Sequence, residues 1–186
     1  MAKVYVFVAE GNEEIENLTT CDVLNRGGND VKMISITGDV NLTGSNGFGI
    51  RADAVFEEGA YEDGDCFIIP GGMPGTNNLG DFAPLTALLK RKFEEGKHVA
   101  AICAAPMVLG DLGIVNGKKA ICYPGCEGRL TGAEITDVPA VTDGNVTTGR
   151  GPGAAMDFGL ELVRVLNGAE KAAEVKAGLV YPYGPY

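Results

Sequence analysis

The chain has 186 residues, of which 45% are hydrophobic and 22% are charged, and its formal net charge at pH 7 is −10. This size and composition predict one globular domain over residues 1–186 with a substantial core, and they exclude an intrinsically disordered chain. The acidic balance argues against binding to nucleic acids or to anionic membrane surfaces.

Apolar segments of strand type alternate along the chain with amphipathic helical segments. In chain order, strands are expected at 3–9, 31–36, 53–56, 66–69, 99–102 and 119–123, with a hairpin or excursion over 40–50 and a hairpin formed by 138–141 and 145–148. Helices are expected at 13–24, 82–95, 106–112, 155–166 and 169–176. This alternation predicts an α/β three-layer sandwich with a mostly parallel central sheet.

No apolar run is long enough to span a membrane, and the short run from Val4 to Ala9 lacks the length and cleavage site of a signal peptide. We therefore expect a soluble, cytoplasmic protein with no membrane partner. The odd number of cysteines, five, favours free thiols over a disulfide framework. Cys122 and Cys126 are spaced C-x3-C, but a chain with a single histidine and no second such pair is not expected to bind structural zinc.

Cys103 stands where a predicted strand meets a predicted helix. The apolar run from Val99 to Ile102 leads into it, and Pro106 suits the first turn of the helix that follows. The small neighbours Ala101 and Ala105 would allow a sharp turn like a nucleophile elbow, where N–H groups at the helix start would lower the pKa of the thiol. For this segment taken alone, a small buried apolar cysteine is the equal alternative.

The predicted sheet brings distant polar segments to one edge, because ligands of open α/β sheets bind beyond the carboxyl ends of the strands. These segments are the turn with Glu13, Glu14 and Glu16, the loop 70–75, Cys103, and 150–152. A bare N–H group of the Pro-Gly-Gly loop could form an oxyanion hole with the N–H group of Ala104. For residues 70–72 taken alone, an ordinary tight turn is the favoured alternative.

Four segments, in order, resemble the ThiJ/PfpI superfamily: 9–18 (AEGNEEIENL), 68–79 (IIPGGMPGTNNL), 100–109 (AAICAAPMVL) and 148–163 (TGRGPGAAMDFGLELV). They are most similar to the branch of the Parkinson-disease protein and its bacterial relatives, and the likeness runs from Lys3 to about Leu179. The resemblance implies a flavodoxin-like sandwich, of the class I glutamine-amidotransferase-like type, with a nucleophile elbow. It also implies a homodimer and an activity that needs no cofactor or metal.

The resemblance assigns Cys103 as the reactive thiol and Glu16 as the carboxyl group that hydrogen-bonds to it. The backbone donors it implies are Gly72 and Ala104, and the pocket residues it implies are Gly71, Tyr123, Arg150 and Pro152. A protonated Glu16 could donate to the thiolate and act as a general acid or base. Glu13 and Glu14, by contrast, are expected to be helix-start charges on the surface.

The sequence departs from the family pattern at its histidines. Tyr123 stands where many dimers of this branch have a histidine, and Ala104 stands where protease-type relatives have one. His98, the single histidine, lies five residues before Cys103, at the opposite end of a strand that rises roughly 3.3 Å per residue. We expect it on the surface or at the strand end, so a Cys–His peptidase or amidase is disfavoured.

The resemblance, together with a cysteine and a glutamate but no histidine at the predicted site, favours a cysteine-dependent glyoxalase (a lyase) or deglycase (a hydrolase). Its substrates would be small reactive dicarbonyls, such as methylglyoxal, or glycated adducts of them. One alternative is an oxidative-stress sensor in which Cys103 is oxidised to a sulfinate. Another is a chaperone or binding module that uses the apolar tail 179–186, which we expect to pack on the body or on a partner subunit.

Overall fold

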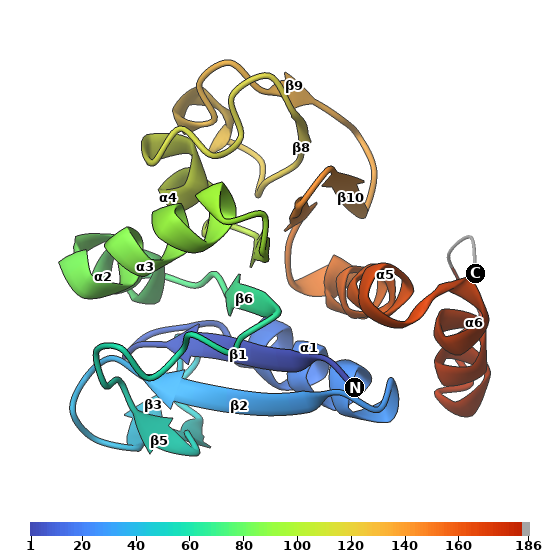
Figure 1. Ribbon diagram of the computed structural model, residues 1–186, viewed down its shortest axis with the longest axis horizontal. Helices are drawn as coiled ribbons and strands as arrows, with labels where there is room; N and C mark the ends of the chain where they lie inside the picture. Colours follow the sequence, from blue (N-terminus) through green and yellow to red (C-terminus); the bar gives the residue numbers. More distant parts are fainter. Residues whose placement is uncertain (184–186) are drawn as a thin grey trace.

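A seven-stranded sheet forms the centre of the computed structural model, which describes residues 1–183 (Figure 1). The strand order is β10-β11-β7-β6-β1-β2-β5, and neighbouring strands are parallel except β10 and β11. The strands are β1 (Lys3–Val8), β2 (Asp30–Ser35), β5 (Ala54–Val55), β6 (Cys66–Ile69), β7 (His98–Ile102), β10 (Ala140–Asp143) and β11 (Val146–Gly149).

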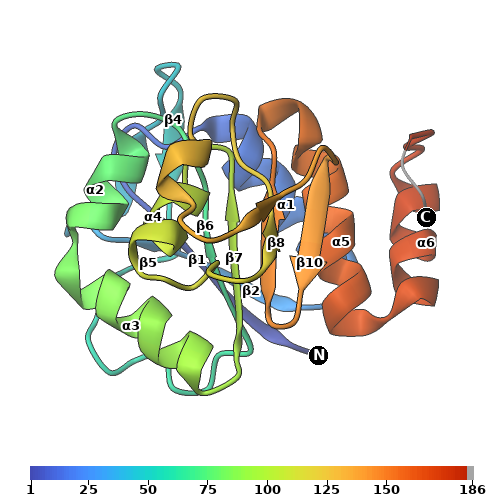
Figure 2. The same ribbon diagram turned by 90° about the horizontal axis from the view of Figure 1, so that it is seen from above.

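Helices cover both faces of this sheet (Figure 2). One layer contains α2 (Gly75–Asp81), α3 (Ala83–Glu94) and α4 (Pro106–Asp111), and the other contains α1 (Glu14–Arg26) and α5 (Ala155–Asn167), with α6 (Ala169–Gly178) outside α5. β1, β6 and β7 are buried because both of their faces are covered, which explains their continuous apolar sequences. The predicted three-layer, mostly parallel sandwich is confirmed.

Two small sheets lie outside the central one. β3 (Asn41–Thr43) and β4 (Gly49–Arg51) form an antiparallel hairpin, as expected for the excursion over 40–50. β8 (Lys119–Ala120) pairs with β9 (Glu134–Ile135), and two short 3-10 turns cover Glu127–Arg129 and Pro152–Ala154. The strand predicted over 119–123 is therefore too long, because the chain leaves β8 to bring the Tyr123 amide to the Cys103 carbonyl.

Of the two expected places for His98, the strand end is confirmed, since it is the first residue of β7, but the surface is wrong. It is 7% exposed, because β7 is an interior strand with β6 on one side and β11 on the other. Its Nε2 lies 2.7 Å from Thr147 Oγ1 on β11, and this hydroxyl lies 2.8 Å from Thr142 Oγ1 on β10. Thr142 in turn donates to the carboxylate of Glu161 at 2.6 Å. His98 thus belongs to a buried polar chain at the end of the strand remote from Cys103.

The C-terminal tail packs on the body at Tyr181. This half-buried side chain donates a hydrogen bond of 2.8 Å from its hydroxyl to Asp157 on α5. The predicted packing of the tail thus holds at this position, whereas residues 184–186 lie outside the described part of the chain. Within residues 1–183, none of the helices combines the length and the apolar character needed to cross a membrane.

Candidate active site

Cys103 occupies a sharp turn between β7 and α4. Its backbone φ is +66°, a left-handed conformation that is uncommon for a residue with a side chain. Two backbone hydrogen bonds hold it: its N–H donates to Gly149 O at 2.9 Å, and its carbonyl accepts from Tyr123 N at 2.7 Å. Such strain persists where the surroundings enforce it, often at functional sites. The predicted nucleophile elbow is present.

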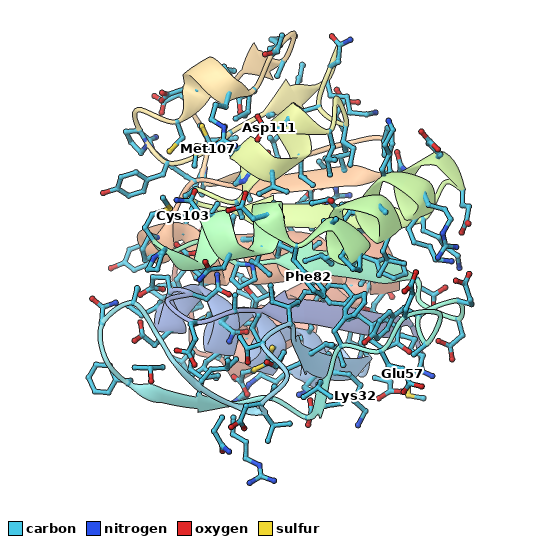
Figure 3. All side chains as sticks on the ribbon, turned by 90° about the vertical axis from the view of Figure 1, so that its left-hand side faces the viewer. Lys32, Glu57, Phe82, Cys103, Met107 and Asp111 are labelled. Atoms are coloured by element: carbon cyan, nitrogen blue, oxygen red, sulfur yellow. The ribbon has the colours of Figure 1, made fainter. Side chains whose placement is uncertain are left out.

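Figure 3 shows Cys103 at one end of the sheet, where β7 stops, with Met107 and Asp111 on the helix that leads away from it. The side chain is 7% exposed, so the thiol reaches the pocket while most of its surface is covered. The structure therefore places the thiol beyond the carboxyl end of β7, as the sheet rule predicts.

Glu16 lies in the first turn of α1 and is fully buried. Its Oε2 accepts a hydrogen bond of 2.8 Å from the Gly71 N–H group, and the carboxyl also interacts with the Cys103 thiol. Oε1 is buried and has no hydrogen-bond partner among the described residues. Burial raises the pKa of Glu16 to about 7, against the opposing effects of Cys103 and Gly71. Glu16 can therefore carry a proton near neutral pH.

The environment of the thiol differs from the sequence-based expectation. Burial, followed by the negative charge of Glu16, raises the pKa of Cys103, whereas the N–H groups of Gly72 and Ala104 act in the opposite direction. The prediction that the start of the helix lowers the pKa of the Cys103 thiol is wrong. α4 has only six residues, and the effect of burial on this pKa outweighs that of the two N–H groups. A proton on Glu16 removes the charge that raises the thiol pKa and provides a donor to the thiolate.

The glycine loop requires its two glycines for different reasons. A Cβ atom at Gly71 would lie 2.7 Å from the Cys103 Cβ atom and 2.8 Å from Glu16 Oε2. Gly72 has a φ of +83°, and a Cβ atom there would lie 2.3 Å from Glu13 N. The bare backbone of Gly71 can therefore approach the side chains of Cys103 and Glu16, and that of Gly72 can approach the backbone of Glu13.

Asn12 anchors this loop and was missed by the sequence reasoning. It is fully buried, and its Nδ2 donates to the carbonyls of Pro70 at 3.2 Å and Gly71 at 2.7 Å, while its Oδ1 accepts from Ala9 N at 2.6 Å. Its position in the turn directly after β1 is the one signal that could have indicated it, because asparagine side chains commonly bond nearby backbone in turns.

A pocket of about 480 Å³ opens over Cys103, and the residues that line it come from five parts of the chain: Glu13, Glu14, Ile15, Ser45, Asn46, Phe48, Cys103, Tyr123 and Pro152. Tyr123 and Pro152 were expected here. The hairpin residues were not, because their sequence carries no motif that points to the thiol.

The expectation that Glu13 and Glu14 are surface charges is also wrong, since each is 7% exposed. Glu13 is the N-cap of α1, and its carboxylate accepts a hydrogen bond of 2.8 Å from Glu16 N. Glu14 accepts hydrogen bonds from the hairpin between β3 and β4. Both carboxylates are covered because this hairpin folds over the start of α1.

Arg150 lines a neighbouring pocket of about 360 Å³ and forms an ion pair with Asp137. Tyr123 and Pro152 line both pockets. Gly71 lies behind the thiol, where it contacts Cys103 and Glu16. The predicted pocket residues are therefore close together, although Arg150 and Gly71 do not line the Cys103 pocket itself.

The remaining cysteines are free thiols: Cys66 and Cys122 are buried, and Cys21 and Cys126 are half-buried. No group of three or more metal-ligating side chains that could hold an ion occurs within residues 1–183.

Comparison with known proteins gives a consistent result. Residues 2–165 match the model of the DJ-1/PfpI family. Protein DJ-1 homolog B of Arabidopsis thaliana is 37% identical over 185 residues, which are 98% of this chain, although the chain spans only 42% of that protein's length. A Pyrococcus abyssi protein named a deglycase is 30% identical, with 88% of this chain and 99% of that protein covered. The structure of oxidized DJ-1 from Toxoplasma gondii is similar with a TM-score of 0.92 and 36% identity, covering 98% of this chain and all of that one.

Proposed function

Because this chain belongs to the DJ-1/PfpI family, we propose that it is a cofactor-independent cysteine enzyme of the glyoxalase or deglycase type. The observation that carries the proposal is the buried pair of Glu16 and Cys103, with the N–H groups of Gly72 and Ala104 directed at the thiol. The deglycase name of the archaeal relative supports the same class of reaction.

In the proposed reaction, the Cys103 thiolate attacks the aldehyde carbon of methylglyoxal. The S–C bond forms as the C=O π bond opens, and the N–H groups of Gly72 and Ala104 stabilise the resulting alkoxide oxygen. This oxygen then takes from Glu16 the proton that the thiol had given to it, which leaves a neutral hemithioacetal and an ionised Glu16. Ionised Glu16 then removes the proton of the same carbon to give an enediolate and returns it to the neighbouring carbon, while the hydroxyl proton of the first carbon passes to the oxygen of the second. The product is a thioester of a 2-hydroxy acid, and its hydrolysis by water releases lactate and restores the thiol.

The pKa of about 7 for Glu16 suits this proton transfer, because a group that both accepts and donates works best when its pKa is near the working pH. The reaction requires no histidine. His98 is bound to Thr147 at the far end of β7, which supports a carbonyl substrate over a peptide bond.

Lactate release from methylglyoxal tests the proposal. Cys103→Ala and Glu16→Gln should each lower the rate by roughly 100-fold or more, whereas Cys126→Ala, outside the pocket, should leave it unchanged. Full activity in either site variant would exclude the mechanism. Supplying an isolated arginine adduct in place of free methylglyoxal distinguishes the two types, because a glyoxalase acts only on the dicarbonyl that the adduct releases.

Oxidation of Cys103 is the second candidate function. The N–H groups of Gly72 and Ala104, together with a protonated Glu16, could donate hydrogen bonds to the oxygens of a sulfinate at this position. The similar structure from Toxoplasma gondii is that of oxidized DJ-1, which supports this candidate.

We also propose that the chain forms a homodimer through α1. Ile15 and Leu18 are 56% and 49% exposed, and their three-residue spacing places them on one face of the helix. Ile15 also lines the Cys103 pocket, so a partner seated there would lie at its rim.

A further inference from the structure

The turn between β3 and β4 forms a wall of the Cys103 pocket. Ser45, Asn46 and Phe48 all line the pocket, although they belong to a separate two-stranded sheet. Figure 2 shows this hairpin projecting from the body of the molecule beside the label β4. A projecting two-stranded element is only marginally stable by itself, so other contacts must hold it over the thiol.

Glu14 supplies these contacts at the tip of the hairpin. Its Oε1 accepts from the backbone N–H groups of Asn46 at 2.9 Å and Phe48 at 3.2 Å. Its Oε2 accepts from Asn46 Nδ2 at 2.9 Å and, at a longer 3.4 Å, from the Ser45 hydroxyl. Burial raises the pKa of Glu14, but these hydrogen bonds outweigh burial and hold that pKa below its ordinary value. A charged carboxylate with several donors makes strong hydrogen bonds.

Two glycines of the turn, Gly44 and Gly47, allow its backbone to approach the Glu14 carboxylate. A Cβ atom at Gly44 would lie 2.3 Å from both Cδ and Oε1 of Glu14, so the turn can close on the carboxylate only where the side chain is missing. Gly47, with a φ of +87°, allows the backbone to reverse so that the N–H groups on both sides of it face Glu14.

The start of the turn is held by different contacts. Gly11 N donates to Thr43 O at 2.8 Å, and Ser45 N donates to Asn12 O at 2.9 Å. The carboxylate of Glu10 accepts a hydrogen bond of 2.9 Å from Thr43 N. Loss of the Glu14 carboxylate should therefore release residues 46–48 of the turn while its start, at Thr43 and Ser45, stays attached to the turn after β1.

Phe48 is the large side chain that the tip carries. It is 70% exposed although it is apolar, and it lines the same pocket as Cys103. Its backbone N–H group is one of those bound by Glu14, so the position of this ring depends on the carboxylate.

We propose that Glu14 is a positioning residue that clamps the β3–β4 turn over Cys103, and that Phe48, held by this clamp, limits the size of the electrophile that reaches the thiol. The inference deepens the proposed function, since it implies that the substrates are small carbonyl compounds. It can nevertheless be tested by alkylation of the thiol, which requires no turnover, so that a failure of the clamp and a failure of the catalytic proposal are distinguishable.

The experiment measures the rate of alkylation of Cys103 by two reagents, iodoacetamide and the bulky N-(1-pyrenyl)maleimide, with the modified peptide identified by mass spectrometry. The ratio of the two rates is compared in the native chain, Glu14→Ala, Glu14→Gln, Phe48→Ala and the control Glu10→Gln. The control removes a charge that binds the same hairpin at Thr43, just before the turn. Hydrogen exchange of the Asn46 and Phe48 amides reports whether the tip is released.

Glu14→Ala and Phe48→Ala should each increase the rate with the bulky reagent by roughly tenfold and leave the rate with iodoacetamide within about twofold, since opening a steric wall favours the larger reagent. Glu14→Gln keeps one acceptor and should lie between Glu14→Ala and the native chain, and Glu10→Gln should match the native chain. Of the two variants that react faster with the bulky reagent, only Glu14→Ala should also show fast hydrogen exchange of the Asn46 and Phe48 amides, because Phe48→Ala keeps the hydrogen bonds to Glu14.

An unchanged rate ratio in Phe48→Ala would overturn the proposal, and so would an equal increase of both rates in Glu14→Ala, which would indicate general loosening. If Glu14→Ala does not fold, Glu14→Gln and Phe48→Ala still decide the outcome, because Phe48 is exposed and its removal leaves the hydrogen bonds of the clamp in place.

Discussion

A Cβ atom at Gly71 would lie 2.7 Å from the Cys103 Cβ atom, so the glycine loop and Cys103 are in contact with no space for even a methyl group between them. The same added atom would lie 2.8 Å from Glu16 Oε2. The loop, the acid and the thiol therefore form one packed unit, in which a displacement of any member moves the other two.

Gly71→Ala should consequently impair the site directly. The backbone φ of Gly71 is not left-handed, so the effect comes from crowding and not from conformational strain. We expect the lactate-forming rate to fall by roughly tenfold or more and the free energy of unfolding to fall by about 1–3 kcal/mol. Gly128→Ala is the matched control, since a Cβ atom there meets no neighbour within 4 Å. Equal behaviour of the two variants in activity assays and urea titrations would contradict the packed unit.

The elbow and the loop have local signatures in the sequence, namely an apolar strand that ends in a small-residue turn and a Pro-Gly-Gly segment. The family resemblance was needed to favour them over an ordinary buried cysteine and an ordinary turn, and it alone selected Glu16 among three neighbouring glutamates. The sequence did not predict the burial of Glu13, Glu14 and His98. Burial of a polar side chain depends on what packs over it, and the covering groups come from distant segments, namely the β3–β4 hairpin and strand β11.

α2 was missed for a related reason. Its sequence, Gly75–Asp81, contains two glycines and no apolar repeat, so it carries no helical signal of its own. Packing against the rest of the chain buries Leu79 completely and stabilises this helix despite its weak propensity.

Cys103 should be the most rapidly oxidised of the buried thiols. It reaches the pocket and faces the N–H groups of Gly72 and Ala104, whereas Cys66 is fully buried in β6. After mild peroxide treatment, mass spectrometry should find sulfinate at Cys103 roughly tenfold faster than at Cys66. Oxidation of Cys103 no faster than that of Cys66 or Cys21 would exclude the sensor function.

Leu18→Glu should disrupt the proposed dimer, because it places a charge on the exposed apolar face of α1. Light scattering should give the native chain about twice the monomer mass of 19.3 kDa and the variant a mass near that of the monomer. Ile135→Glu, on the exposed strand β9, is the control and should leave the mass unchanged. A native chain with the monomer mass would contradict the dimer.

Glu16 should destabilise the folded chain as the pH rises. Burial raises its pKa from 4.5 to about 7, so the folded state retains a proton that the unfolded state releases, and stability is lost as the pH rises through this window. The difference corresponds to roughly 3 kcal/mol. The free energy of unfolding of Glu16→Gln, relative to the native chain, should therefore be larger at pH 8 than at pH 4 by about this amount. Urea titrations at the two pH values measure it, and a constant difference would show that folding does not shift the pKa of this carboxyl.

His98 should have the opposite dependence. Burial lowers its pKa from 6.5 to about 4, against the smaller effect of Glu161, so the unfolded state binds a proton that the folded state does not. Stability from this group is present above pH 6.5 and is lost as the pH falls towards 4, again by roughly 3 kcal/mol. His98→Gln should remove this loss in urea titrations at pH 4 and 7.5. It should also keep full lactate-forming activity, because His98 lies at the end of β7 remote from Cys103.

The two groups oppose each other between pH 4.5 and 6.5, where the folded state gains protons at Glu16 relative to the unfolded state and forgoes one at His98. Their contributions to the native chain should therefore largely cancel in this window. As the pH falls through this window, the free energy of unfolding should decrease more steeply in Glu16→Gln than in the native chain, and it should increase in His98→Gln. The double variant should have the same pH dependence as the native chain, because the two side chains belong to separate hydrogen-bond networks and their effects add. Parallel curves for the native chain and both single variants would show that neither burial shifts a proton on folding.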